Sequence, residues 1–230
     1  MPDLTTIAFD ADDTLWQNER HFRLTVARFA DLLADYAPVD HLKDRLLAAE
    51  RRNLARYGYG VKGFVLSMIE TAIEVTHDRV PTSVIRSLIE AGHEMLAHPT
   101  ELLSGVEETI LALKGRYRLM IVTKGDLLHQ ERKVAASGLG DHFDAVEVVA
   151  DKTAPVYEAL FRRHGVSPGR AAMVGNSLKS DVIPVLAIGG WGVHVPHDLT
   201  WALEQELPPT AHPRFAELRR LGDLPQWLLG

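Results

Sequence analysis

From residue 100 onward the chain alternates short strand-like runs with longer helix-like segments, and this alternation constrains the fold more than any other feature. Strands are predicted at 117–123, 145–149, 171–175 and 191–195, and helices at 105–114, 126–137, 154–164 and 180–188. Such alternation is typical of a parallel sheet with helices packed on its faces. The apolar, β-branched run 4–9 predicts one further strand of the same sheet.

A stretch with helical periodicity separates this first strand from the rest of the predicted sheet. From about residue 19 to residue 97, apolar residues recur at three- and four-residue spacing, and prolines divide the stretch into four predicted helices. The pattern therefore predicts an α/β core with an all-helical domain inserted after its first strand.

Composition and charge exclude several classes of protein. Hydrophobic residues make up 46% and charged residues 24%, which is typical of a folded globular chain. The net charge of −6 argues against nucleic acid as a partner. The chain has no cysteine, which excludes disulfides, thiolate zinc sites and a cysteine nucleophile. Because we find neither a secretion signal nor 18 consecutive apolar residues, we expect a cytoplasmic protein with no membrane partner.

Polar and charged residues follow four of the predicted strands. They are Asp10 and Asp12, then Thr123, Lys124 and Gly125, then Lys152, and finally Asn176, Ser177 and Asp181. Ligands of open α/β sheets collect at the carboxyl ends of the strands. A single strand-end aspartate often only caps a helix or holds a turn. Four such ends together favour a ligand-binding or catalytic site.

The order and spacing of these residues resemble the four motifs of the haloacid dehalogenase-like hydrolase superfamily. Residues 7–15, Ile-Ala-Phe-Asp-Ala-Asp-Asp-Thr-Leu, are similar to the first motif of the superfamily, an apolar strand followed by Asp-x-Asp-x-Thr. Residues 119–123 are similar to the second motif, a strand that ends in Ser or Thr. Lys152 and the run 175–181 complete the set. The resemblance extends across nearly the whole chain.

The resemblance implies a three-layer, Rossmann-like α/β core made of residues 1–16 and 100–230. It also implies that residues 17–99 form the α-helical cap domain of the superfamily's most common subtype. We expect this cap to close over the site and to read the leaving-group alcohol. The implied activity is that of a Mg²⁺-dependent phosphatase acting on a small phosphorylated metabolite.

The resemblance assigns roles to the two aspartates that follow the first strand. Asp10 would be the nucleophile that attacks phosphorus and forms an aspartyl-phosphate. Asp12 would act as acid and base, which needs a carboxyl group with a pKa near the working pH. Asp13 matches no required motif position, so we expect it to be structural.

Three further groups would bind the phosphate in the same scheme. Lys152 would supply a fixed positive charge, and Thr123 would donate its hydroxyl to a phosphoryl oxygen. The backbone amides of Lys124 and Gly125 would form an anion-binding turn. The Lys124 side chain is equally well explained as a solvated loop lysine.

A hard cation with oxygen ligands would complete the site. Mg²⁺ would bind the Asp10 carboxylate, the Asp12 backbone carbonyl and a residue of the fourth motif. The chain has Asn176 where many family members have aspartate, so either the Asn176 oxygen or the Asp181 carboxylate is the ligand. With one fewer negative ligand, we expect weaker metal binding.

Two groups of residues are candidates for substrate recognition. Basic and aromatic residues gather around Gly58 and Gly60, in what the pattern predicts to be a loop; they are Arg51, Arg52, Arg56, Tyr57, Tyr59 and Lys62. This cluster would bind a second anionic group or would simply be a solvated helix end. The other candidates follow the first motif, namely Trp16, Gln17, Asn18 and His21.

Two other functions stay open at this point. A 2-haloacid dehalogenase is disfavoured by Asp12, because related dehalogenases carry a non-acidic residue there and need no leaving-group acid. A protein that binds a phosphorylated metabolite without turnover is the other alternative, since a fold alone does not determine function. The substrate and the oligomeric state are left undecided by the sequence.

Overall fold

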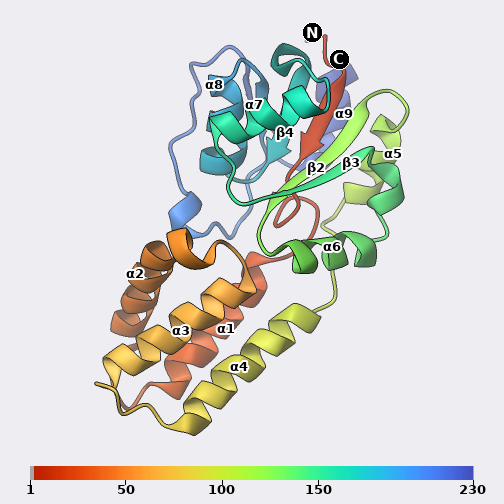
Figure 1. The fold of residues 1–230 in the computed structure, drawn as a ribbon. Coiled ribbons are helices and arrows are strands. Elements are labelled where there is room, and N and C mark those ends of the chain that lie inside the picture. The colour runs from red at the N-terminus through yellow and green to blue at the C-terminus, as the bar shows by residue number, and fades with distance from the viewer. Residues whose placement is uncertain (1–2, 230) are drawn as a thin grey trace. The chain divides into compact units, whose positions relative to one another are not determined.

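The computed structural model describes residues 3–229, and the chain divides into two compact units. One unit contains the residues up to Glu19 and those from Thr100 onward, and the other contains Arg20–Pro99. Figure 1 shows the course of the chain through both units. Among the described residues, no helix has the length and apolar character needed to cross a membrane.

A six-stranded parallel sheet forms the centre of the first unit, with the strand order β3-β2-β1-β4-β5-β6. Its strands are β1 (Thr6–Phe9), β2 (Arg118–Lys124), β3 (Ala145–Val149), β4 (Ala171–Gly175), β5 (Trp191–His194) and β6 (Phe215–Glu217). Strand β1 lies between β2 and β4, and Phe9 is level with Ile121 and Val174. The carboxyl ends of these three strands therefore meet at one edge.

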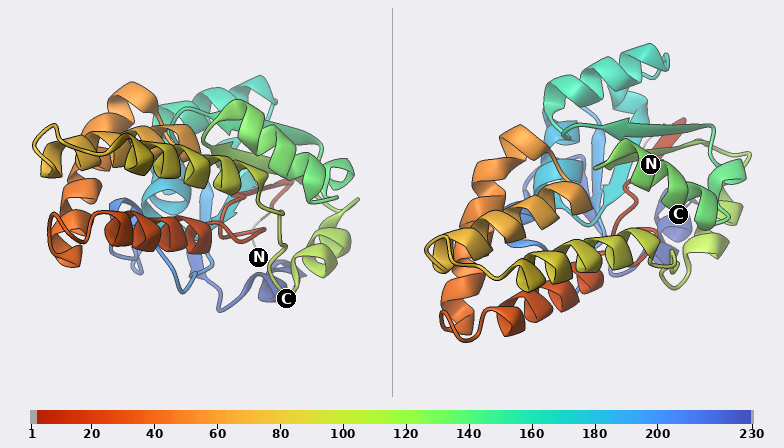
Figure 2. Two further views of the ribbon diagram at one scale, coloured as in Figure 1. Left: turned by 90° about the horizontal axis from the view of Figure 1, so that it is seen from below. Right: turned by 60° about the horizontal axis from the view of Figure 1, so that its bottom comes forward.

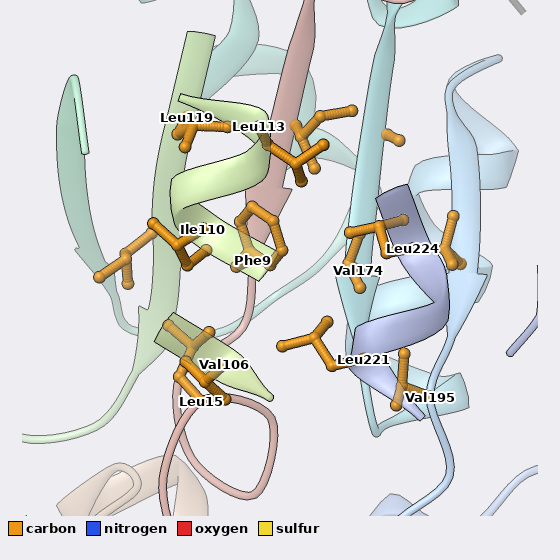
Figure 3. Packing of buried hydrophobic residues seen from close by; sticks show 14 of the residues in the cluster. Phe9, Leu15, Val106, Ile110, Leu113, Leu119, Val174, Val195, Leu221 and Leu224 are labelled. Atoms are coloured by element: carbon orange, nitrogen blue, oxygen red, sulfur yellow. The ribbon is translucent and has the colours of Figure 1, made fainter. Parts of the chain in front are cut away.

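Helices cover both faces of this sheet, as Figure 1 shows. They are α5 (Val106–Leu113), α6 (Leu127–Ala136), α7 (Ala154–Arg163), α8 (Ile183–Ala187) and α9 (Leu224–Leu229). Because successive strand residues point to opposite faces, Phe9 belongs to one buried cluster with Ile110 of α5 and Leu224 of α9. Figure 3 shows Phe9 beside Ile110, and Leu224 beside Val174. The neighbour of Phe9, Ala8, packs with Tyr157 of α7 in the cluster on the other face. The predicted three-layer α/β fold is confirmed.

The second unit is a bundle of four helices that lie alongside one another (Figure 2). They are α1 (Glu19–Leu32), α2 (Val39–Tyr57), α3 (Val61–Val75) and α4 (Thr82–Ala97). Their apolar stripes enclose a separate core that includes Phe29, Leu46, Met68 and Leu88. The helical periodicity of the sequence reflects this core, because buried positions recur every three or four residues.

The basic and aromatic cluster of this unit is mostly helical, which corrects the expectation of a loop. Helix α2 continues to Tyr57, so the connection to α3 is only three residues long. Two members of the cluster are already engaged, because Tyr57 donates to Glu70 at 2.7 Å and Arg52 lies 3.3 Å from the same carboxylate. This arrangement matches the helix-end interpretation for those two side chains.

The predicted helix 180–188 forms in two parts. A π-helical turn covers Leu178–Val182, and the α-helix α8 begins only at Ile183. Pro184 has no N–H to donate to the carbonyl of Ser180, which instead accepts a hydrogen bond from the Tyr157 hydroxyl at 3.1 Å. Strand β6 and helix α9 were not predicted, because both are very short.

Candidate active site

The candidate site lies at the carboxyl edge of the sheet, and Asp10 stands near its middle. The Asp10 amide donates to the carbonyl of Val174 at 2.9 Å, so the backbone of Asp10 is held against the neighbouring strand β4. Its carboxylate, which is buried, pairs with the Lys152 ammonium. Lys152 also lies 2.7 Å from Asp181 Oδ1. One buried lysine thus connects residues that follow β1, β3 and β4.

The surroundings of Asp10, Lys152 and Asp181 determine the pKa of Asp10 and of Lys152. Burial and the charge of Asp181 raise the pKa of Asp10 to about 7, although Lys152 acts in the opposite direction. Burial acts to lower the pKa of Lys152, but the two carboxylates raise it above its ordinary value. Lys152 therefore remains charged and supplies a fixed positive charge beside Asp10.

Three side chains hold the Asp12 carboxylate. Trp16 Nε1 and Lys133 Nζ each lie 2.7 Å from Asp12 Oδ1, and Gln130 Nε2 lies 3.0 Å from Oδ2. Burial acts to raise the pKa of Asp12, but the charge and hydrogen bond of Lys133, with help from the other donors, leave it below its ordinary value. The expectation of a pKa near the working pH is wrong for this arrangement, in which Asp12 is ionised.

The second motif contributes Thr123 and Lys124 from the end of β2. The buried Thr123 hydroxyl accepts a hydrogen bond from Gln130 Nε2 at 2.8 Å. Lys124 is not a solvated loop lysine, because its Nζ lies 2.5 Å from Glu204 Oε1 and 2.8 Å from Ser180 Oγ. Gly125 follows with a φ of 139°, a conformation that favours glycine.

The fourth motif forms a tight turn after β4. Ser177 Oγ accepts from the Ser180 amide at 3.0 Å, and the Ser177 amide donates to Asp181 Oδ2 at 3.0 Å. A Cβ at position 175 would lie 2.2 Å from Asp181 Oδ2, so only glycine leaves room for that carboxylate. Both Asp181 oxygens are occupied, one by Lys152 and the other by the Ser177 amide.

Asn176 faces the oxygens of the first motif. Its Oδ1 lies 3.1 Å from Thr14 Oγ1. Turning the amide over places its nitrogen at this position, 3.2 Å from the Asp12 carbonyl oxygen and 3.1 Å from Asp10 Oδ2. One atom of the Asn176 amide therefore lies close to both the Asp12 carbonyl oxygen and the Asp10 carboxylate.

These oxygens are of the type that holds Mg²⁺. In an octahedral Mg²⁺ site with ligands at about 2.1 Å, adjacent oxygens lie about 3 Å apart. The Asn176 amide atom lies 3.1 and 3.2 Å from the two first-motif oxygens, which suits a hydrogen bond from the amide nitrogen as well as a cation shared by oxygens. Among the described residues, no three His, Cys, Asp or Glu side chains are grouped to hold a metal. The candidate site therefore depends on an amide and a backbone carbonyl.

The structure brings together the predicted residues of the four motifs and adds several that sequence reasoning missed. The additions are Gln130, Lys133 and Glu204. Trp16, a candidate substrate contact, donates a hydrogen bond to Asp12. Gln130 and Lys133 are three residues apart on α6, a spacing that places them on one helix face. No sequence signal identifies Glu204, which is 80 residues from its partner Lys124.

Asp13 has a structural role, as predicted. Its carboxylate accepts hydrogen bonds from the amides of Asn18 at 2.9 Å and Glu19 at 3.0 Å. These two amides lie at the start of helix α1, where no earlier carbonyl is available to them. The Asp13 carboxylate therefore caps the N-terminal end of helix α1.

Comparison with known proteins gives a family match across most of the chain. The model of the haloacid dehalogenase-like hydrolases matches residues 4–189. A haloacid dehalogenase-like family hydrolase from Xanthomonas campestris superposes with a TM-score of 0.88 at 40% identity, over 98% of this chain and 91% of that one.

Two curated relatives match over a shorter stretch. Glyceraldehyde 3-phosphate phosphatase of Methanothermobacter thermautotrophicus is 31% identical over 101 residues, which are 41% of this chain and 44% of the relative. Human N-acylneuraminate-9-phosphatase is 34% identical over 92 residues, 38% of this chain and 37% of the relative. The chain thus spans less than half the length of each. The family match and the arrangement of the four motifs show that this chain belongs to the haloacid dehalogenase-like hydrolase family.

Proposed function

We propose that the chain is a Mg²⁺-dependent phosphatase that hydrolyses a small phosphomonoester through an aspartyl-phosphate on Asp10. The observation that carries this proposal is the buried Asp10–Lys152 pair with a second carboxylate, Asp12, only two residues further on. Both curated relatives described above are named as phosphatases. Asp12 matters most here, because a halide leaving group needs no acid whereas an alkoxide does.

In the first step, an Asp10 oxygen attacks phosphorus and the bond from phosphorus to the alcohol oxygen breaks. Asp12 gives its proton to the departing alkoxide. Asp12 is ionised in the free protein, so it first takes up this proton from solvent; the negative charge of the bound phosphate favours that uptake, because like charge disfavours the carboxylate. In the second step water attacks the phosphorus of the aspartyl-phosphate, Asp12 takes the proton from that water, and Asp10 is released.

The charges of the site support the need for a divalent cation. Four carboxylates (Asp10, Asp12, Asp181 and Glu204) are paired with three lysines (Lys124, Lys133 and Lys152). A phosphate dianion would add two more negative charges. Mg²⁺ held by Asp10, the Asp12 carbonyl and the Asn176 oxygen would offset this charge and polarise the phosphoryl group. We favour Asn176 over Asp181 as the third ligand, because both Asp181 oxygens already have partners.

Replacing Asn176 with aspartate is expected to strengthen Mg²⁺ binding about tenfold or more, because a negative ligand replaces a neutral one. Without metal, the same variant should unfold at a lower temperature, since a further carboxylate then lies beside Asp10. Calorimetric titration with Mg²⁺ and thermal unfolding with and without EDTA measure both effects. Equal Mg²⁺ affinity in the variant and the natural protein would argue against Asn176 as a ligand.

The test of the proposed function is phosphate release from an aryl phosphate and a panel of phosphorylated metabolites, each with Mg²⁺ and with EDTA. We expect metal-dependent release, fastest for one class of phosphomonoester. Halide release from 2-haloacids without metal would instead identify a dehalogenase. Binding of phosphorylated compounds with no turnover would identify a binding protein.

We also propose that the helical unit selects the substrate. Its residues Arg56 and Lys62 lie near the ends of α2 and α3 that meet at the short connection. A basic pair at such a position suits a second anionic group on the substrate. The metabolite panel therefore includes sugar phosphates, nucleotides and phosphorylated carboxylic acids.

A further inference from the structure

Gln130, on the first turns of α6, is placed between the first and second motifs. Its side-chain nitrogen lies 3.0 Å from Asp12 Oδ2, 2.8 Å from Thr123 Oγ1 and 3.0 Å from the Lys124 carbonyl oxygen. The residue is 2% exposed, so these contacts form away from water. One amide group thus touches two of the side chains to which the proposed function gives roles.

The chemistry of these neighbours determines which way each hydrogen points. A backbone carbonyl only accepts hydrogen bonds, so the NH₂ of Gln130 must face the Lys124 carbonyl, and its two hydrogens are shared among the three oxygens that surround the nitrogen. On the other side of the amide, Oε1 has no hydrogen-bond partner among the described residues, so nothing there favours the opposite orientation. The Thr123 hydroxyl, which can either donate or accept, therefore accepts from this nitrogen.

Because the Thr123 hydroxyl oxygen accepts a hydrogen bond from Gln130, its own proton points away from the Gln130 nitrogen. No acceptor for the Thr123 proton is found among the described residues, so the proton is available to an incoming oxygen. Without Gln130, no side chain of the described residues would fix the direction of the Thr123 hydroxyl, and its proton would then be less available to a phosphoryl oxygen.

We propose that Gln130 is a positioning residue, which orients the Thr123 hydroxyl as a donor to the phosphoryl group. The inference rests on the proposed phosphatase function, in which Thr123 binds phosphate. Gln130 does not touch the substrate in this scheme, and its effect on phosphate binding passes through the Thr123 hydroxyl. This prediction distinguishes it from a residue that only packs the site.

The experiment is a double-mutant cycle with inorganic phosphate as a competitive inhibitor at saturating Mg²⁺. Gln130→Met is expected to raise the inhibition constant for phosphate about tenfold, the value of one lost hydrogen bond. Thr123→Val removes the hydroxyl, and in this background Gln130→Met should change the constant less than about twofold. In the conservative Thr123→Ser background, the full tenfold effect should return.

Controls separate this role from a loss of folding. Glu131 lies on the exposed face of the same helix, so Glu131→Met should leave phosphate binding unchanged. Gln130→Leu is made alongside Gln130→Met, and thermal unfolding of every variant is recorded. Equal effects of Gln130→Met in the natural and Thr123→Val backgrounds would overturn the inference. If the natural protein neither hydrolyses phosphomonoesters nor binds phosphate, the proposed function itself fails.

Discussion

Asp10→Asn is expected to reduce phosphate release by at least about 10⁴-fold for every substrate, the size of loss typical when a catalytic nucleophile is removed. An amide has nearly the same shape as the carboxylate but does not attack phosphorus. Folding should be little affected, because Asp10 is a buried acid whose pKa is already raised to about 7, so its negative charge contributes little stability. Steady-state kinetics and thermal unfolding measure the two effects.

The covalent step can be tested directly in the same experiment. Rapid quenching with acid followed by mass spectrometry should find a phosphoryl group on Asp10 in the natural protein and none in the variant. Asp198→Asn is a matched control, because it makes the same chemical change at an exposed aspartate of the same unit. Turnover that survives in Asp10→Asn would exclude Asp10 as the nucleophile.

Lys152→Met is expected to have the largest effect on stability. The Lys152 side chain is 1% exposed and pairs with both Asp10 and Asp181, so its removal leaves two carboxylates buried without their cation. Breaking such a buried pair costs about 3–5 kcal/mol of unfolding free energy. The kcat should fall about 10²–10³-fold, because a fixed positive charge beside the reacting phosphoryl group is lost.

A second substitution separates these two consequences of losing Lys152. In Lys152→Met/Asp181→Asn, one of the unpaired carboxylates becomes neutral, so urea denaturation should show that part of the stability returns. The kcat should stay low, because no positive charge has been restored. Recovery of kcat in the double variant would mean that Lys152 acts on the fold alone.

Strands β1 to β5 were predicted to within a few residues because each is a short apolar run. Local pattern also predicts the helices of the second unit, since each buries an apolar stripe. The π-helical turn at Leu178–Val182 was missed, because it depends on Pro184 together with the Tyr157 hydroxyl, which comes from another helix. The short strand β6 was missed because its stability comes from pairing with β5.

The sequence alone identified the residues that stand at the ends of the strands. The order of a parallel sheet brings such positions to one edge, so Asp10, Thr123, Lys152 and Asn176 were expected to come together, and they do. Their spacing in the chain is sufficient for this inference, because strand ends are defined by local pattern. Glycine at position 175 follows from the same motif.

Only the tertiary structure decided how the charges of these residues are balanced. The Asp12 carboxylate accepts hydrogen bonds from Gln130 and Lys133, which are 118 and 121 residues away in the sequence. Glu204 pairs with Lys124, which is 80 residues away. The ionised state of Asp12 and the engaged state of Lys124 depend on these contacts. The physical reason is that a buried charge responds to whichever groups surround it in space, and no local pattern in the sequence records those neighbours.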